Sequence, residues 1–213
     1  MLDQTTALLV IDMQNDFVPG GALAVKGGNE ILNGINYLIT EAFKKNVTIV
    51  FTQDWHPIGH KSFASALEGM KPGDIHSEEG IGPVLWPDHC VQGTPGSDFV
   101  DGLLVSKASL ILRKGMNPNI DSYSAFLEND KKTETGLRGY LETRGIKKVL
   151  IVGLATDYCC YYSALDVKSF GFETTFIKDL TRGVDIPENN VNLALSDMKN
   201  RGISILELSD LKI

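Results

Sequence analysis

An acid, an amine and a thiol each come directly after, or a few residues after, a short apolar run in this 213-residue sequence. They are Asp12 after residues 7–11, Lys114 after residues 110–112 and Cys159 after residues 149–152. A thiol with a base and a cation beside it is suited to nucleophilic attack on a carbonyl carbon. If Thr156 or Asp157 caps a helix, Cys159 lies in its first turn, where the helix dipole and free N–H groups favour the thiolate.

Each of these residues also has an ordinary structural explanation. Asp12 could cap a turn, Lys114 could be a solvated surface lysine, and Cys159 could be a packed thiol. The neighbouring Cys160 is expected to face the core as a small hydrophobe, because it shares a helical stripe with an alanine and a valine further along. None of the three ionisable residues is specific alone, but their shared position at the ends of expected strands favours the catalytic interpretation.

A second group of chemically competent residues consists of Asp54 and His56, with His60 and His89 further along the chain. Two histidines and a carboxylate suit a catalytic Zn²⁺ or Fe²⁺ site. Asp54 and His56 are two residues apart, so their side chains share one side of an extended segment. The alternative is a loop rich in hydrogen-bonding histidines, and the pattern alone does not decide between the two.

The elements that must position these residues are short strands alternating with helices. Nearly continuous apolar runs occur at 7–11, 47–51, 110–112, 149–152, 174–177 and 203–206. Such runs are typical of strands buried on both faces of a parallel sheet. Helical periodicity lies between several of them, at 31–43, 137–145 and 187–202. In the first of these, the inward stripe is predicted to be Ile31, Leu32, Ile35, Leu38, Ile39, Ala42 and Phe43.

This alternation predicts an α/β fold with three layers and a doubly wound, mainly parallel six-stranded sheet. Ligands of such sheets bind outside the carboxyl ends of the strands, which is where both candidate groups fall. No G-x-G-x-x-G motif follows a strand, so the sheet by itself does not indicate a nucleotide.

One segment, from about 54 to 107, has no strong period. It contains five of the eight prolines, all four histidines and both tryptophans. A connection of this length in a compact α/β domain is usually functional. Within it, His76 is expected at the surface and Cys90 in a packed position. We predict a single domain, residues 1–213, with a metal-site insertion at about 54–107.

Composition excludes several classes of function. The chain has 20 basic and 27 acidic side chains, a formal net charge of −7, so its surface is expected to repel nucleic-acid phosphates. Its apolar runs are strand-sized, far below the ~20 residues of a membrane span. No basic-then-apolar signal peptide opens the sequence. Three cysteines cannot form a disulfide framework, which fits a cytoplasmic protein.

Six segments of the chain carry a resemblance to a known family. They are 10–17 (VIDMQNDF), 52–57 (TQDWHP), 86–91 (WPDHCV), 113–115 (RKG), 121–126 (DSYSAF) and 153–160 (GLATDYCC). In this order they resemble the isochorismatase-like cysteine amidohydrolases over nearly the whole chain. Trp86-Pro87-x-His89-Cys90 together with Asp54-x-His56 is similar to the metal-dependent nicotinamidase branch, because other branches generally lack this metal set.

The resemblance implies hydrolysis of nicotinamide to nicotinic acid and ammonia through a cysteine thioester, in NAD salvage. Asp12 would accept the thiol proton, Cys159 would attack the carboxamide carbon, and Lys114 would orient and support both. The backbone N–H groups of Ala155 and Cys159 would hold the oxyanion. Family members also have a cis peptide before the residue that matches Ala155.

The resemblance further implies one divalent metal ion that binds the pyridine nitrogen of the substrate. Asp54, His56 and His89 would hold it, and His60 is a direct ligand in some members and a neighbour in others. Zinc is the expected ion, with Fe²⁺ or Mn²⁺ as alternatives. Three aromatic residues match positions that wall the substrate ring: Phe17, Trp86 and Tyr123. Nicotinamide is the partner implied, and a homo-oligomer is left open.

Three points stay open in the sequence. A lysine near Asp12 should depress the pKa of that carboxyl and weaken it as a base. Tyr158 stands where some relatives have histidine, which bears on the breadth of substrates. The alternatives to nicotinamide hydrolysis are an amidase for a ureido or carbamoyl acid, and a non-catalytic binding member. The metal set argues against the first, and the presence of Asp12, Lys114 and Cys159 argues against the second.

Overall fold

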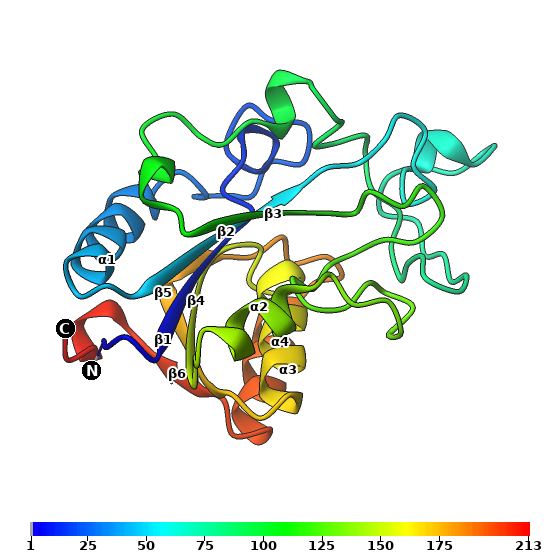
Figure 1. Ribbon diagram of the computed structural model, residues 1–213. Helices are drawn as coiled ribbons and strands as arrows, with labels where there is room; N and C mark the ends of the chain where they lie inside the picture. The colour runs from blue at the N-terminus through cyan, green and yellow to red at the C-terminus, as the bar shows by residue number, and fades with distance from the viewer. Residues whose placement is uncertain (1) are drawn as a thin grey trace.

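A six-stranded parallel sheet forms the centre of the computed structural model, which describes residues 2–213 (Figure 1). The strands are β1 (Thr6–Ile11), β2 (Thr48–Asp54), β3 (Leu110–Lys114), β4 (Lys148–Leu154), β5 (Glu173–Arg182) and β6 (Ser204–Leu206). They lie in the order β3-β2-β1-β4-β5-β6, and every pairing is parallel. The predicted doubly wound α/β fold is confirmed. The strand order reverses between β1 and β4, where sheets of this kind bind ligands.

The central strands are continuous apolar runs because helices or loops cover both of their faces. Every residue of β1 and β2 is buried, as are the last six of β4. Strand β3 lies at one edge and alternates between buried and more exposed residues. It also extends two residues beyond the predicted run, so Lys114 is its last residue.

Helices cover the two faces of the sheet unequally, which gives the three layers seen in Figure 1. Helix α1 (Leu32–Lys44) lies on one face, and α2 (Leu137–Thr143), α3 (Cys159–Ser169) and α4 (Asn190–Asn200) lie on the other. The predicted α1 stripe is largely confirmed, since Ile35, Leu38, Ile39 and Ala42 are buried. Phe43 was wrongly assigned to it: its side chain is 53% exposed, and the Lys107 ammonium lies 4.0 Å from its ring centroid.

The connection between β2 and β3, residues 55–109, contains the segment without a strong period and is called the insertion here. Its helical turns are η2 (Ala64–Ala66), η3 (Pro95–Ser97) and η4 (Val105–Lys107), each of three residues. Single bridges join His56 to Val91 and Phe63 to Trp86. The N–H of Val100 donates to the carbonyl of Met13 at 2.9 Å, which ties the insertion to the loop after β1. The insertion therefore folds back over the carboxyl edge of the sheet.

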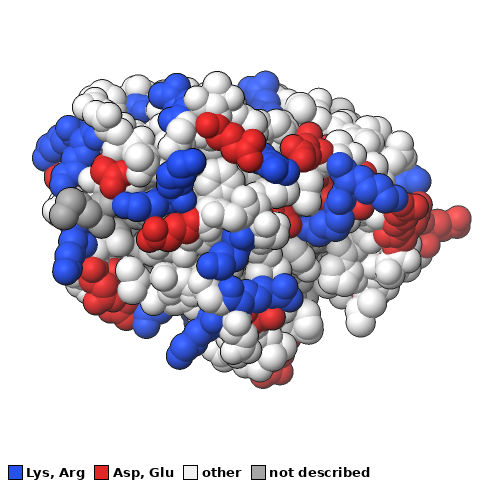
Figure 2. All heavy atoms as spheres, turned by 60° about the horizontal axis from the view of Figure 1, so that its bottom comes forward, with Lys and Arg blue, Asp and Glu red and all other residues white. Residues whose placement is uncertain are grey.

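Charged side chains are dispersed over the molecular surface in the view of Figure 2. Lysine and arginine alternate with aspartate and glutamate across that face, with an acidic group at one end. Such mixing gives no extended basic patch on that face of the kind that nucleic-acid binding uses. Within residues 2–213, no helix has the length and apolar character needed to cross a membrane.

Candidate active site

Four neighbouring strands deliver the candidate catalytic residues to one edge of the sheet. Asp12 is the first residue after β1, Asp54 is the last of β2, and Lys114 is the last of β3. Cys159 begins α3, a short turn after β4. The strand order places these four ends side by side, and the β2–β3 register pairs Asp54 directly with Lys114. Parallel pairing is therefore what brings residues distant in sequence together.

The ammonium of Lys114 lies between the acid and the thiol. Its Nζ is 2.9 Å from Asp12 Oδ2 and 3.4 Å from Cys159 Sγ. It also donates to the Ser122 carbonyl at 2.8 Å and pairs with Asp54 Oδ1. All of these side chains are buried. The three predicted catalytic residues thus form one buried cluster around a single cation.

Asp12 is oriented by a residue that sequence analysis did not single out. Thr52 Oγ1 donates to Asp12 Oδ1 at 2.6 Å and accepts the Asp12 N–H at 3.1 Å. This holds Asp12 at a φ of 44°, a left-handed conformation that is unusual for aspartate. Its other oxygen, Oδ2, accepts no hydrogen bond of good geometry within residues 2–213, although it faces the Lys114 ammonium. That oxygen has room for a proton from the thiol.

Burial, rather than the nearby lysine, sets the direction of the Asp12 pKa. Removal from water raises the pKa of the Asp12 carboxyl, with the charge of Asp54 adding to the rise, and Lys114 and Thr52 only partly oppose it. Lys114 does lower this pKa, as expected, but burial outweighs it and the net direction is upward. Burial also raises the pKa of the Cys159 thiol well above its usual range, against the pull of Lys114. A neutral thiol therefore faces a carboxylate with an increased affinity for protons.

The turn before α3 differs from the predicted cap. Tyr158 occupies the N-cap position and Cys159 is the first helical residue, so neither Thr156 nor Asp157 caps the helix. The Leu154–Ala155 peptide is cis, as the resemblance implied. Within residues 2–213, the backbone N–H groups of Ala155 and Cys159 donate no hydrogen bond, so both are free to bind an oxyanion. Cys160 is fully buried, as predicted.

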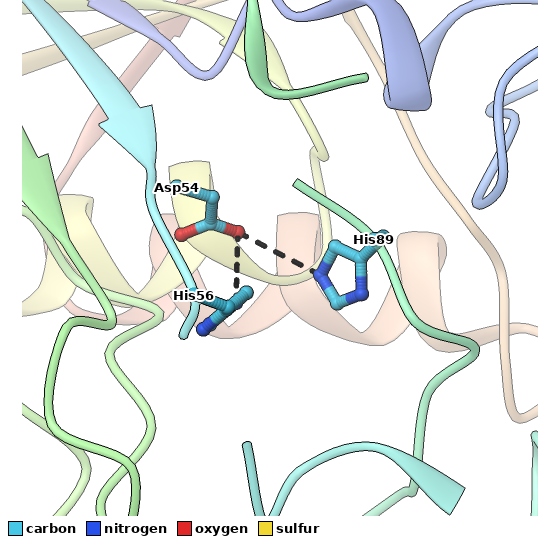
Figure 3. Close-up of side chains that lie close together, drawn as sticks. All are labelled: Asp54, His56 and His89. Carbon is cyan, nitrogen blue, oxygen red and sulfur yellow. Dashed lines mark ion pairs between the residues drawn. The ribbon is translucent and has the colours of Figure 1, made fainter. Parts of the chain in front are cut away.

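Asp54, His56 and His89 converge at one point (Figure 3). Asp54 Oδ2 is 3.7 Å from His56 Nε2 and 3.8 Å from His89 Nε2. His56 Nδ1 donates to the Gly115 carbonyl at 2.9 Å, and His89 Nδ1 donates to the Pro87 carbonyl at 2.8 Å. Because a carbonyl only accepts, each ring must carry a proton on Nδ1, which leaves Nε2 as the ring atom that points toward Asp54.

The geometry of this group fits one divalent ion. The separations exceed a hydrogen bond but are shorter than the ~4.2 Å spanned by two zinc–ligand bonds. Burial lowers the pKa of His89 to about 4, and the nearby His56 adds to the fall, so the ring is neutral near pH 7. The pKa of Asp54 is held below its usual range: burial opposes this, but the Lys114 charge and the imidazoles outweigh it. A metal needs neutral imidazoles and an ionised carboxylate. Burial would lower the pKa of His56, but Asp54 and Asp121 raise it, so an ion bound here would displace a proton from that ring.

His60 lies beside this group rather than within it. Its ring centroid is 4.4 Å from that of His56, and its Nε2 is 3.4 Å from the Ile120 carbonyl. Its Nδ1 accepts the Ser62 N–H at 3.2 Å. His60 belongs instead to a second cluster with His56 and Asp121, whose candidate ligand atoms lie within 4.8 Å of one another. Sequence analysis missed Asp121 as an acid at this site, because its position depends on how the loop after β3 folds.

The thiol and the candidate metal ligands open on the same pocket. Cys159, Asp54, His56 and His89 all line it. The three predicted aromatic residues also line it: Phe17, Trp86 and Tyr123. Leu23, Tyr158 and Val184 complete its apolar wall and were not predicted to do so.

The aromatic wall is held together by its own contacts. Trp86 Nε1 donates to the Tyr123 hydroxyl at 3.0 Å. Tyr158 packs edge-on against both rings, with centroids 4.8 Å from Trp86 and 5.3 Å from Tyr123. A pocket of this kind accepts a small planar molecule that presents a carbonyl to the thiol and a lone pair to the Asp54 group.

Comparisons with known proteins agree with this geometry. A family model of the Isochorismatase domain matches residues 6–210. The nicotinamidase of Acinetobacter baylyi is 50% identical over 181 residues, which cover 84% of this chain and 82% of that protein. The structure of a nicotinamidase and pyrazinamidase from Acinetobacter baumanii has a TM-score of 0.94 and 42% identity, with 99% of each chain covered. The pyrazinamidase of Pyrococcus horikoshii, in complex with zinc, has a TM-score of 0.77 and 38% identity, covering 95% of this chain and 99% of that one.

Proposed function

The chain belongs to the isochorismatase family, and from that membership we propose that it is a nicotinamidase that hydrolyses nicotinamide to nicotinic acid and ammonia. The observation that carries the proposal is that Cys159 and the Asp54–His56–His89 group line one aromatic pocket. Nicotinamide is a planar ring with a carboxamide for the thiol and a ring nitrogen for the metal group.

The first step forms a carbon–sulfur bond. The Cys159 proton passes to Asp12 Oδ2, the sulfur attacks the carboxamide carbon, and the carbonyl electron pair moves onto oxygen. Lys114 Nζ lies 2.9 Å from that carboxylate oxygen and 3.4 Å from the sulfur. As the proton is transferred, negative charge moves from the Asp12 carboxylate to the sulfur, both of which lie beside the ammonium, and the attack then moves it onto the carbonyl oxygen. The net charge of the buried cluster does not change during the transfer, which limits its cost.

The second step breaks the carbon–nitrogen bond. The N–H groups of Ala155 and Cys159 stabilise the oxyanion, a contribution of about 3 kcal/mol for each donor. As the oxyanion collapses, Asp12 donates the proton it took from the thiol to the departing nitrogen. Ammonia is released, and the nicotinoyl group stays bound to Cys159 as a thioester. Water then attacks the thioester and gives a proton to Asp12. The carbon–sulfur bond breaks, the sulfur regains a proton, and nicotinic acid is released.

Asp54, His56 and His89 would hold the divalent ion, with zinc expected and Fe²⁺ or Mn²⁺ as alternatives. When bound, such an ion supplies a Lewis acid for the pyridine nitrogen. The chain's own residues orient the ring: Phe17, Trp86 and Tyr123 exclude water from it and limit its rotation.

The proposed reaction places the chain in NAD salvage, which recovers nicotinic acid from nicotinamide. We assign it to the cytoplasm. Support for this location comes from Cys90, Cys159 and Cys160, none of which is in a disulfide in the described chain.

Removal of metal tests the proposed function. Ammonia and nicotinic acid release from nicotinamide should fall by roughly tenfold or more after chelation and dialysis, and should recover with Zn²⁺. His89→Ala should lower the metal content of purified protein, whereas His76→Ala, a histidine outside the group, should not. Full activity in metal-free protein would contradict the metal site. No nicotinamide hydrolysis by folded, metal-loaded protein would contradict the assigned substrate.

A further inference from the structure

We propose that Asp157 is a positioning residue that holds segment 183–187 in place as a wall of the pocket, and so restricts the pocket to small planar amides. The amide substrate itself rests on the proposed function. The placement of the segment does not, because it follows from contacts of the chain alone.

The carboxylate of Asp157 accepts hydrogen bonds from residues within 184–190. It lies two residues before Cys159 and is 2% exposed. Its Oδ1 accepts the Val184 N–H at 3.0 Å, and its Oδ2 accepts the Asp185 N–H at 2.9 Å. Asn190 Nδ2 donates to the same Oδ2 at 3.1 Å. Val184 and Asp185 belong to the connection between β5 and α4, and Asn190 is the first residue of α4.

A helix cap is the ordinary explanation for an acid at this position, and the geometry excludes it. Asp157 makes no capping hydrogen bond to the first turn of α3. Its partners instead include Asp185, whose φ of 58° lies in the left-handed region. The carboxylate thus satisfies donors in a segment that has no regular structure of its own.

The two residues flanking Asp157 bind the same region. The Thr156 N–H donates to the Arg182 carbonyl at 2.8 Å, and the Tyr158 hydroxyl donates to the Ile186 carbonyl. Three consecutive residues of the turn that carries the nucleophile therefore hold the end of β5 and the segment after it. Of these, Asp157 alone binds the backbone of Val184.

Val184 is the residue through which the Asp157 hydrogen bonds affect the pocket. Its side chain lines the pocket together with Cys159 and the aromatic wall. If the Asp157 carboxylate is replaced by an amide, one oxygen becomes an NH₂ group, which cannot accept from a backbone N–H. The segment then loses at least one of its attachments, and Val184 can move away from the pocket.

The test compares access to the Cys159 thiol in Asp157→Asn and in Asp166→Asn. Asp166 is a buried acid on α3 whose carboxylate lies near Lys131, away from the segment. The rate of Cys159 modification is measured by peptide mass spectrometry with iodoacetamide and with the bulkier N-phenylmaleimide. The ratio of the bulky to the small rate should rise about tenfold in Asp157→Asn, equivalent to 1.4 kcal/mol of restored access. It should stay at the wild-type value in Asp166→Asn.

Steady-state kinetics give the second readout. For nicotinamide, KM should rise about tenfold in Asp157→Asn with little change in kcat, as expected when binding contacts common to substrate and transition state are lost. An unchanged modification ratio in folded Asp157→Asn would overturn the proposal. If that variant does not fold, Val184→Ala must show the same rise in the ratio, and its absence there would overturn the proposal. The thiol assay needs no turnover, so its outcome is separate from that of the nicotinamide assay.

Discussion

The ammonium of Lys114 faces two carboxylates and a thiol, and burial decides which of these groups holds a proton. Burial alone would lower the pKa of Lys114, but the charges of Asp12 and Asp54 together raise it well above its usual value. The lysine therefore stays charged throughout the reaction. The Lys114 charge helps to hold the pKa of Asp54 below its usual range, so Asp54 stays ionised beside the metal group. Asp12 has a raised pKa, which suits a general base.

The pH dependence of kcat/KM should report this raised pKa. Asp12 must be unprotonated to accept the thiol proton, so activity is lost as pH falls through its pKa. The Thr52 hydrogen bond favours the ionised form. Its removal in Thr52→Val should therefore move the acid limb to higher pH by about one pH unit.

Thr52→Ser keeps the hydroxyl and serves as the matched control, with the limb of the wild type expected. Metal content is measured on the same samples, so that loss of metal at low pH is not mistaken for titration. An acid limb at the same pH in Thr52→Val and Thr52→Ser would show that Asp12 is not the group that titrates.

The residues that sequence analysis missed act through contacts between strands. Gln14 Nε2 donates to the Asp54 carbonyl, and its Oε1 accepts the Asp54 N–H, both at 2.8 Å. Gln14 and Thr52 thereby fix Asp54 and Asp12 across the β1–β2 boundary. Their roles depend on which strands are neighbours, and no spacing within one segment reveals that. Asp12, Lys114 and Cys159 could be predicted because each carries reactive chemistry at a strand end.

At the level of elements, strands were the most predictable part of the fold and their ends the least. Continuous apolar runs located all six strands, because burial on both faces leaves few polar positions. Strand β5 continues to Arg182, five residues past the predicted run, through a charged stretch that pairs with β4 after a shift in register. Polar residues at a strand end carry no periodic signal, although here they deliver the site.

The close packing of β4 against β1 requires glycine at position 153, and this requirement can be tested. Its φ is +114°, and a Cβ at this position would overlap the backbone of Ile11 on β1. Gly153→Ala should lower the free energy of unfolding by about 2–4 kcal/mol, measured by urea denaturation. Gly171→Ala is the control, since its φ is +87° but nothing lies within 4 Å of the added carbon. That variant should lose about 1 kcal/mol from backbone strain alone. Equal losses would rule out the close approach of β1 and β4.

At the scale of the whole molecule, the fold class could be predicted but the strand order could not. Alternating runs and helical stripes indicate α/β, whereas the order β3-β2-β1-β4-β5-β6 depends on which crossovers pack on each face. The insertion was predictable as a segment from its missing period. Its path back over the sheet was not, because single bridges and loop hydrogen bonds hold it in place.

The single-domain assignment predicts that the insertion unfolds together with the sheet. Both tryptophans, Trp55 and Trp86, lie in the insertion, so their fluorescence reports that segment. The helices α1 to α4 lie outside it and dominate the far-UV circular dichroism. The two signals should have coincident midpoints in urea. Loss of the fluorescence signal at clearly lower urea would mean that the insertion is a separate unit.

Comparison of Cys159→Ala with Cys160→Ala is the most direct test of the central claim, that the thiol at the start of α3 attacks nicotinamide. Both thiols are buried, and only Cys159 lines the pocket. Cys159→Ala should keep its circular dichroism spectrum and lose ammonia release by about a thousandfold or more. Cys160→Ala should release ammonia near the wild-type rate with a modest loss of stability. Wild-type release by folded Cys159→Ala, or an equally deep loss in folded Cys160→Ala, would contradict the account.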